Sequence, residues 1–144
     1  MKLAPLPDLD GMLPGMPTLR VLVVDDNPAE LALIEECFAP YKAKVHVITA
    51  TTAQLALAEL MMISDDERPQ VAMVDINMPL ISGFELAELL IGQDVPTILM
   101  SCQVDAERIE RARAIGAIAV IDKPSNLEGY AAMAQQVLKS ARLI

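Results

Sequence analysis

The sequence predicts an α/β fold in which a doubly wound, five-stranded parallel sheet carries helices on both faces. Five short apolar runs rich in Val and Ile alternate along the chain with five segments of helical periodicity. Most of these runs are continuously apolar, which is typical of strands that are buried on both faces. A length of 144 residues suits a single domain of this kind.

The chain begins with a segment that is rich in Pro, Gly and Met. No helix or strand periodicity survives the spacing of its prolines and glycines, so residues 1–18 are expected to form a flexible segment. Residues 19–144 are expected to form the one folded domain.

The first strand–helix unit is predicted from an apolar run and the capping residues that follow it. Residues 19–24 predict a buried strand. Asn27, Pro28 and Glu30 then have the spacing of an N-cap, a first helical position and an acidic residue in the first turn. The helix is expected to end before Pro40, which cannot continue it.

The second unit has a different strand pattern. Residues 45–49 alternate between apolar and polar side chains, and His46 is interpreted as a surface or edge residue of this strand. Thr51 and Gln54 have the spacing of a capping box and open a helix that runs through Met62. The run 61–63, Met-Met-Ile, is interpreted as core and helix end rather than as a groove for a partner.

The last three units repeat the first pattern. The first and last of their helices are expected to be capped by Ser82 and Ser125. The middle helix is expected to run from about Asp105 and to stop at Gly116. The strands are predicted over residues 71–74, 97–100 and 118–121.

The apolar content of 53% and the mean hydropathy of +0.39 are high for a soluble chain. Two explanations stay open. The sheet covered on both faces accounts for part of this content, and a face that binds a second copy of the chain, giving a homodimer, would account for more.

The formal net charge of -9 argues against a direct nucleic-acid partner, because no basic patch offsets it. No apolar run approaches the ~20 residues that a membrane span requires. The start of the chain lacks the continuous apolar core of a signal peptide, so a cytoplasmic location is expected. The two cysteines, Cys37 and Cys102, have no metal or redox spacing, and Cys37 is expected to be an inert core thiol.

Polar and charged residues stand where the predicted strands end. Because ligands of open α/β sheets bind beyond the carboxyl ends of the strands, these residues are expected to converge on one rim. They are three carboxylates, a hydroxyl and an ammonium: Asp25, Asp26, Asp75, Ser101 and Lys123.

That set favours phosphoryl chemistry with a divalent cation. Three carboxylates packed together repel one another unless a cation is present, and an all-oxygen site suits Mg²⁺. A carboxylate beside such a cation can act as a nucleophile toward a phosphoryl group. Lys123 would add positive charge, and Ser101 could donate a hydrogen bond to the new group.

The chain resembles the receiver domain of two-component response regulators. The resemblance covers residues 19–141, and its motifs are VLVVDDN, MVDINMPLISGFEL, ILMS and IDKP. It implies a flavodoxin-like fold with strand order 2-1-3-4-5. It also implies a signalling phosphoacceptor that catalyses its own phosphorylation and slow dephosphorylation, rather than an enzyme acting on other substrates.

The resemblance also implies roles for individual residues. Asp75 aligns with the phosphoacceptor, and Asp25 and Asp26 with the acidic pair that holds Mg²⁺. Asn77 aligns with the position that offers its backbone carbonyl to the metal. Ser101 aligns with the hydroxyl switch residue, and Lys123 with the family's lysine, which Pro124 usually follows across a cis bond. The expected partners are a histidine kinase or phosphotransfer protein and a downstream protein effector.

One departure from the family pattern and two alternatives stay open. Receivers usually carry Tyr or Phe three residues before the lysine, whereas this chain has Val120. A module of the same fold that binds partners without phosphorylation is therefore an alternative, and so is the N-terminal receiver of a larger regulator. A phosphatase with an aspartyl nucleophile is disfavoured, because it would need an acid where Asn77 stands.

Overall fold

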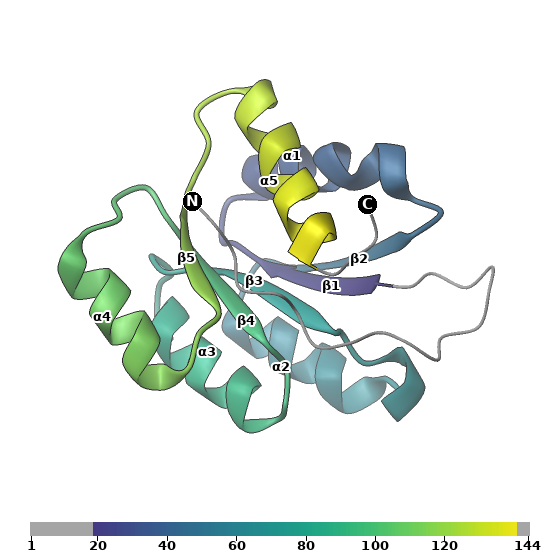
Figure 1. Ribbon diagram of the computed structural model, residues 1–144. Helices are drawn as coiled ribbons and strands as arrows, with labels where there is room; N and C mark the ends of the chain where they lie inside the picture. Colours follow the sequence, from purple (N-terminus) through teal and green to yellow (C-terminus); the bar gives the residue numbers. More distant parts are fainter. Residues whose placement is uncertain (1–18, 141–144) are drawn as a thin grey trace.

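The computed structural model describes residues 19–140, in which five parallel strands form one sheet in the order β2-β1-β3-β4-β5 (Figure 1). The predicted fold class and strand order are thereby confirmed. The expected flexible segment, residues 1–18, lies outside the described residues. The strands are β1 (Leu19–Val24), β2 (Val45–Ala50), β3 (Val71–Asp75), β4 (Thr97–Ser101) and β5 (Ala119–Asp122).

Five α-helices and two short 3₁₀ helices connect these strands. The α-helices are α1 (Pro28–Phe38), α2 (Ala53–Met62), α3 (Gly83–Gly92), α4 (Ala106–Ile115) and α5 (Leu127–Ser140), and the 3₁₀ helices are η1 (Ala39–Tyr41) and η2 (Asp65–Glu67). Helices α1 and α5 cover one face of the sheet, and α2, α3 and α4 cover the other (Figure 1).

The two faces of the sheet bury two separate apolar clusters. Along β1, Val21 and Val23 belong to the cluster under α1 and α5, whereas Leu22 and Val24 belong to the cluster under α2, α3 and α4. All four side chains are at most 1% exposed. Alternate side chains of a strand point to opposite faces, so a strand covered on both sides must be apolar throughout.

Helix caps agree with the sequence prediction at two helices and differ at two. Asn27 and Ser82 cap α1 and α3 as expected, and Asp105, near which the fourth helix was expected to start, caps α4. The cap of α2 is Thr52 rather than Thr51, and the hydroxyl of Thr52 accepts a hydrogen bond from the Leu55 amide at 3.0 Å.

The cap of α5 is also shifted by one residue. The side chain of Asn126, rather than that of Ser125, accepts a hydrogen bond from the Gly129 amide at 2.7 Å. Two adjacent residues that can both cap a helix have the same local signal, and the position at which the helix docks on the sheet decides between them.

The interpretation of Met61 and Met62 as core residues is wrong. Their side chains are 85% and 84% exposed at the end of α2, although the expected helix end is confirmed. The buried face of α2 consists of Ala53, Ala56 and Leu60. A helix turns by about 100° per residue, so the two residues after Leu60 point away from that face.

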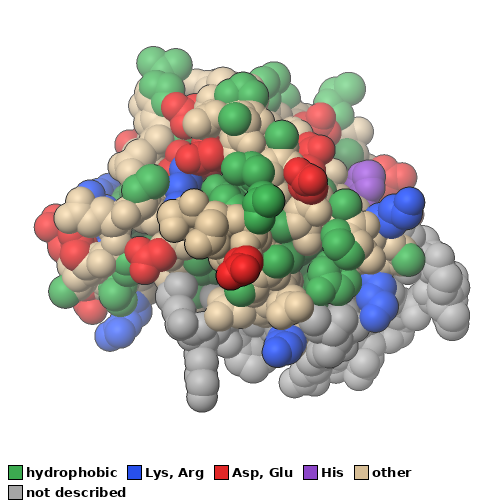
Figure 2. Space-filling view, turned by 90° about the horizontal axis from the view of Figure 1, so that it is seen from above, with side chains coloured by type: hydrophobic (Ala, Val, Ile, Leu, Met, Phe, Trp, Pro, Cys, Tyr) green, Lys and Arg blue, Asp and Glu red, His purple; other side chains and the backbone are tan. Residues whose placement is uncertain are grey.

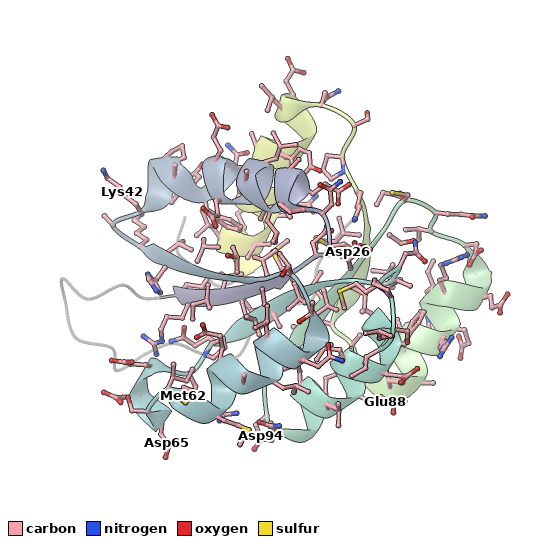
Figure 3. All side chains as sticks on the ribbon, turned by 180° about the vertical axis from the view of Figure 1, so that it is seen from behind. Asp26, Lys42, Met62, Asp65, Glu88 and Asp94 are labelled. Atoms are coloured by element: carbon pink, nitrogen blue, oxygen red, sulfur yellow. The ribbon has the colours of Figure 1, made fainter. Side chains whose placement is uncertain are left out.

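The carboxyl ends of the strands and the two methionines lie at opposite ends of the sheet. Figure 3 shows Asp26 where β1 passes into α1, and Met62 and Lys42 at the other end. No helix among the described residues combines the length and apolarity that a membrane span requires. Seen from above, the molecule has acidic side chains spread over its surface without a continuous basic patch (Figure 2).

Candidate functional site

Two buried carboxylates occupy equivalent positions at the ends of neighbouring strands. Asp25 follows β1 and is 0% exposed, and Asp75 is the last residue of β3 and is 3% exposed. In each case one carboxylate oxygen accepts a hydrogen bond from the amide two residues later. The Asn27 amide is 2.9 Å from Asp25 Oδ1, and the Asn77 amide is 3.1 Å from Asp75 Oδ1. These local turns leave the second oxygen of each carboxylate free to face the rim.

Lys123 brings a positive charge to those second oxygens. Its backbone amide donates to the carbonyl of Ser101 at 2.8 Å, which extends the β4–β5 ladder and fixes where the side chain begins. The ammonium Nζ lies 3.0 Å from Asp25 Oδ2 and 3.2 Å from Asp75 Oδ2. The sequence predicted this convergence, and the structure confirms it.

Glu30 is a member of this cluster that the sequence did not reveal. Its carboxylate accepts a hydrogen bond from Lys123 Nζ across 93 positions of the chain. In the sequence, Glu30 has the ordinary position of an acid in the first turn of α1, and that role explains it fully. The spacing of one turn from Asp26 was the only signal that its side chain could reach the same rim.

The carboxylates fit a hard divalent cation. One carboxylate oxygen from each of Asp25, Asp26 and Asp75 lies within 4.8 Å of the others, with Asp26 exposed and the other two buried. Oδ2 of Asp25 is buried and is ion-paired with Lys123 at 3.0 Å. An all-oxygen donor set that includes such a buried carboxylate oxygen suits Mg²⁺, which takes one or two carboxylates and keeps several waters.

The pKa values of the two buried acids are raised, whereas that of Glu30 is lowered. Burial, together with a hydrogen bond to Glu30, raises the pKa of Asp25 to about 7, against the opposing effects of the Asn27 amide and Lys123. Burial also raises the pKa of Asp75, again against the Asn77 amide and Lys123. The pKa of Glu30 is lowered by its hydrogen bond to Asp25. Negative charge in this cluster is therefore unfavourable until a cation compensates it.

The pKa of Lys123 is shifted in the opposite sense to that of a simple buried lysine. Burial alone would lower it, but hydrogen bonds to Glu30 and Asp25 outweigh burial and raise it. Lys123 is therefore a fixed positive charge at neutral pH, beside the carboxylate of Asp75.

A comparison with protein families decides the identity of this arrangement. The model of the response regulator receiver domain matches residues 21–135, which contain both buried carboxylates and the lysine. The chain belongs to this family.

Individual proteins agree with the family assignment. The two-component response regulator ARR11 of Arabidopsis thaliana is 33% identical over 122 residues, which are 84% of this chain and 23% of that protein. The two-component response regulator ORR24 of Oryza sativa subsp. indica is 30% identical over 122 residues, which are 84% of this chain and 19% of that protein. The receiver therefore spans about a fifth of the length of these relatives.

A solved structure shows the same fold. The chemotaxis protein CheY4 of Vibrio cholerae superimposes with a TM-score of 0.69 at 27% identity, over 83% of this chain and 98% of that protein.

The other two predicted site residues of the receiver lie at the same rim but face differently. The hydroxyl of Ser101 donates to the carbonyl of Gln103 at 2.8 Å and accepts from the Gln103 amide at 3.1 Å, so it is engaged with its own loop. Asn77 is exposed, and its backbone amide binds Asp75 as described above. In the described residues of the receiver every peptide bond is trans, so the expected cis bond before Pro124 is wrong. Trans is the isomer that X–Pro bonds favour by ~0.5–1 kcal/mol.

Val120 occupies the position that usually carries an aromatic ring in receivers. Its side chain is 5% exposed and packs in the cluster under α2, α3 and α4. The aromatic ring of that cluster is Phe84, and the guanidinium of Arg111 lies 4.2 Å from its centroid. The position is thus occupied by a small, buried apolar side chain.

Proposed function

We propose that this receiver accepts a phosphoryl group on Asp75 and thereby switches the binding of a protein partner. The contact between Lys123 Nζ and Asp75 Oδ2, at 3.2 Å, carries the proposal. It supplies a positive charge beside a buried carboxylate at the end of β3, the middle strand of the sheet. Phosphoryl transfer depends mainly on positioning and on charge neutralisation, and this pair offers both.

The cation of the proposal is Mg²⁺. Asp25, Asp26 and Asp75 would hold it through carboxylate oxygens, and Asn77 through its backbone carbonyl. When bound, the ion supplies neutralisation of charge on the transferring phosphoryl oxygens. Asp25 offers a buried carboxylate oxygen at the rim, which suits such an ion.

In the proposed reaction, an oxygen of the Asp75 carboxylate forms a bond to phosphorus as the bond from phosphorus to the donor's imidazole nitrogen breaks. The donor, a phosphohistidine of a histidine kinase or phosphotransfer protein, leaves with the electron pair of that bond and takes a proton from solvent. Lys123 neutralises the phosphoryl oxygens. The signal ends by slow hydrolysis, in which water attacks phosphorus, the bond from phosphorus to the Asp75 oxygen breaks, and inorganic phosphate leaves the restored carboxylate.

Ser101 is the proposed trigger of the output. Its hydroxyl now donates to the carbonyl of Gln103 and would have to turn to donate to a phosphoryl oxygen. That turn releases the carbonyl and amide of Gln103, and so frees the loop between β4 and α4. Because Val120 fills the position of the usual ring, the change is expected to stay closer to this loop than in receivers with an aromatic residue.

We also propose how the chain is divided and where it acts. Residues 1–18 would be a flexible lead into a receiver of residues 19–144, which acts in the cytoplasm. This chain spans about a fifth of its long relatives, which supports the view that a receiver of this kind can be part of a larger regulator; the N-terminal part is the position we propose. A partner-binding module that needs no phosphoryl group is the second candidate, and the buried Val120 is the observation that favours it.

Incubation with acetyl phosphate and Mg²⁺ tests the proposal. Intact mass spectrometry should show one phosphoryl adduct that hydroxylamine removes, and Asp75→Asn should abolish it while the variant still unfolds cooperatively. Asp122→Asn removes an exposed acid at the end of β5 and should leave the adduct unchanged. A wild-type chain without any adduct would support the second candidate.

A further inference from the structure

The carboxylate of Glu30 reaches from helix α1 to Lys123. It comes from the first turn of α1, and its side chain is 25% exposed. It accepts a hydrogen bond from Lys123 Nζ, the atom that also contacts Asp25 Oδ2 and Asp75 Oδ2. Three carboxylates from three different segments therefore share one ammonium.

We infer that Glu30 is a positioning residue that holds Lys123 away from an incoming phosphoryl group and thereby sets the balance between cation and anion binding at this rim. The inference rests on the proposed function and deepens it. Glu30 would act through Lys123 and through its own charge, without touching the reacting atoms.

A phosphoryl group on Asp75 would compete with the present carboxylate partners for the N–H donors of Lys123. An ammonium has three N–H donors and no acceptor, and here three carboxylates surround it. A phosphoryl group on Asp75 brings further oxygens that need the same donors, so one of the present partners must give up its hydrogen bond. Glu30 is the partner free to do so, because Asp25 is 0% exposed whereas the Glu30 side chain is partly in solvent.

The negative charge of Glu30 should affect the binding of a divalent cation and the binding of a phosphoryl group in opposite directions. Glu30 adds a fourth negative charge to a rim that already has Asp25, Asp26 and Asp75. That charge favours a divalent cation by attraction. It disfavours a phosphoryl group both by repulsion and by occupying Lys123. A residue that merely maintained the shape of the rim would instead favour both ligands.

Glu30→Gln separates these possibilities, because it keeps the length and the hydrogen-bond acceptor but removes the charge. Isothermal titration calorimetry with MgCl₂ should give a Kd about tenfold higher than that of the wild type, which corresponds to ~1.4 kcal/mol. Titration with beryllofluoride, a small analogue of a phosphoryl group, at saturating Mg²⁺ should give a Kd that is lower by about the same factor.

Glu35→Gln is the matched control. Glu35 is an exposed acid on the same helix, so this variant has the same change in net charge and should leave both Kd values unchanged. Glu30→Ala gives a second variant, in which Lys123 loses the acceptor as well, and it should shift both Kd values in the same directions as Glu30→Gln.

The outcomes distinguish a failure of the role of Glu30 from a failure of the proposed function. Weaker binding of both ligands by Glu30→Gln, or no change in either, overturns the role of Glu30 while leaving the proposed function intact. A wild-type chain that binds Mg²⁺ but no beryllofluoride overturns the proposed function and the role of Glu30 together.

Discussion

The ammonium of Lys123 lies 3.2 Å from the carboxylate of Asp75, although α3, β4, α4 and β5 separate the two residues in the chain. The contact arises because both residues stand at carboxyl ends of parallel strands, and such ends meet at one edge of the sheet. Asp75 is the last residue of β3, and Lys123 follows β5 directly. The site is thus a consequence of sheet topology rather than of any local motif.

Lys123→Met should destabilise the receiver, and more at high pH than at low pH. The variant leaves Asp25 and Asp75 buried without their cation, which should lower the free energy of unfolding by about 2–3 kcal/mol at pH 8. A raised pKa means that the fold disfavours the ionised carboxyl. Without the ammonium, the folded pKa of Asp25 rises above its wild-type value of about 7. The loss from this carboxyl is therefore full above the raised pKa of the variant and disappears as the pH falls through about 7, because the carboxyl is then protonated in both proteins.

Urea unfolding of this variant at pH 8 and pH 5 measures the difference. Lys42→Met removes an exposed lysine after η1 and should change the free energy of unfolding little at either pH. An equal loss at both pH values in Lys123→Met would show that the packing of the lysine side chain, rather than its charge, stabilises the fold.

Mg²⁺ should raise the melting temperature of the wild-type chain through preferential binding to the folded state. At a free concentration ten times the Kd, the gain is ~1.4 kcal/mol, or roughly 4 °C for a domain of this size. Asp26→Asn removes an exposed member of the carboxylate cluster without opening a cavity, and it should abolish most of that shift.

Differential scanning calorimetry in MgCl₂, with NaCl of matched ionic strength as the reference, measures the shift. The same shift in NaCl would mean that general screening of the net charge of -9, rather than a site, stabilises the chain.

Gly83→Ala should be strongly destabilising, because the added Cβ would lie 2.1 Å from the backbone oxygen of Asp75 and 2.6 Å from Ile76 Cα. Both are backbone atoms that cannot move without displacing Asp75, so a loss on the order of 3 kcal/mol or more is expected. Gly92→Ala provides the opposite result on the same helix. Nothing lies within 4 Å of its Cβ, so Ala should stabilise the last turn of α3 by up to about 1 kcal/mol.

Chemical denaturation of the two alanine variants gives both values. If Gly83→Ala were as stable as the wild type, the start of α3 would have to lie farther from the end of β3 than it does in the structure.

Cys37 should resist alkylation while Cys102 reacts. Burial raises the pKa of Cys37 to about 12, and its thiol donates to the carbonyl of Ile34 at 2.9 Å, whereas Cys102 is exposed. Only the thiolate is nucleophilic, so iodoacetamide at pH 8 should label one cysteine first. Because the folded pKa of Cys37 is above its ordinary value of 9.0, the thiol contributes stability that is lost as the pH rises above about 9.

Peptide mapping of the alkylated chain identifies the labelled residue, and alkylation in urea provides the control in which both cysteines react. Equal labelling in the folded chain would contradict the raised pKa and the partly buried position of Cys37.

Patterns along the chain were sufficient to predict the elements and most of the rim. Strand ends at Val24, Val74 and Met100 could be located because an apolar run gives way abruptly to a polar residue, to within one residue of the observed ends. Capping chemistry placed Asn27 and Ser82 correctly. Where two capping residues are adjacent, as at Thr51 and Thr52, the local signal is the same for both and the prediction was off by one.

The sequence by itself determined five strand–helix units and a set of acids, a hydroxyl and a lysine at strand ends, because periodicity and capping are properties of neighbouring residues. Only the tertiary structure decided that Glu30 shares Lys123, that Ser101 faces Gln103, and that Met61 and Met62 point into solvent. Those facts depend on how each helix is rotated against the sheet and how each loop closes. Contacts between segments far apart in the chain fix both, and no local pattern encodes them.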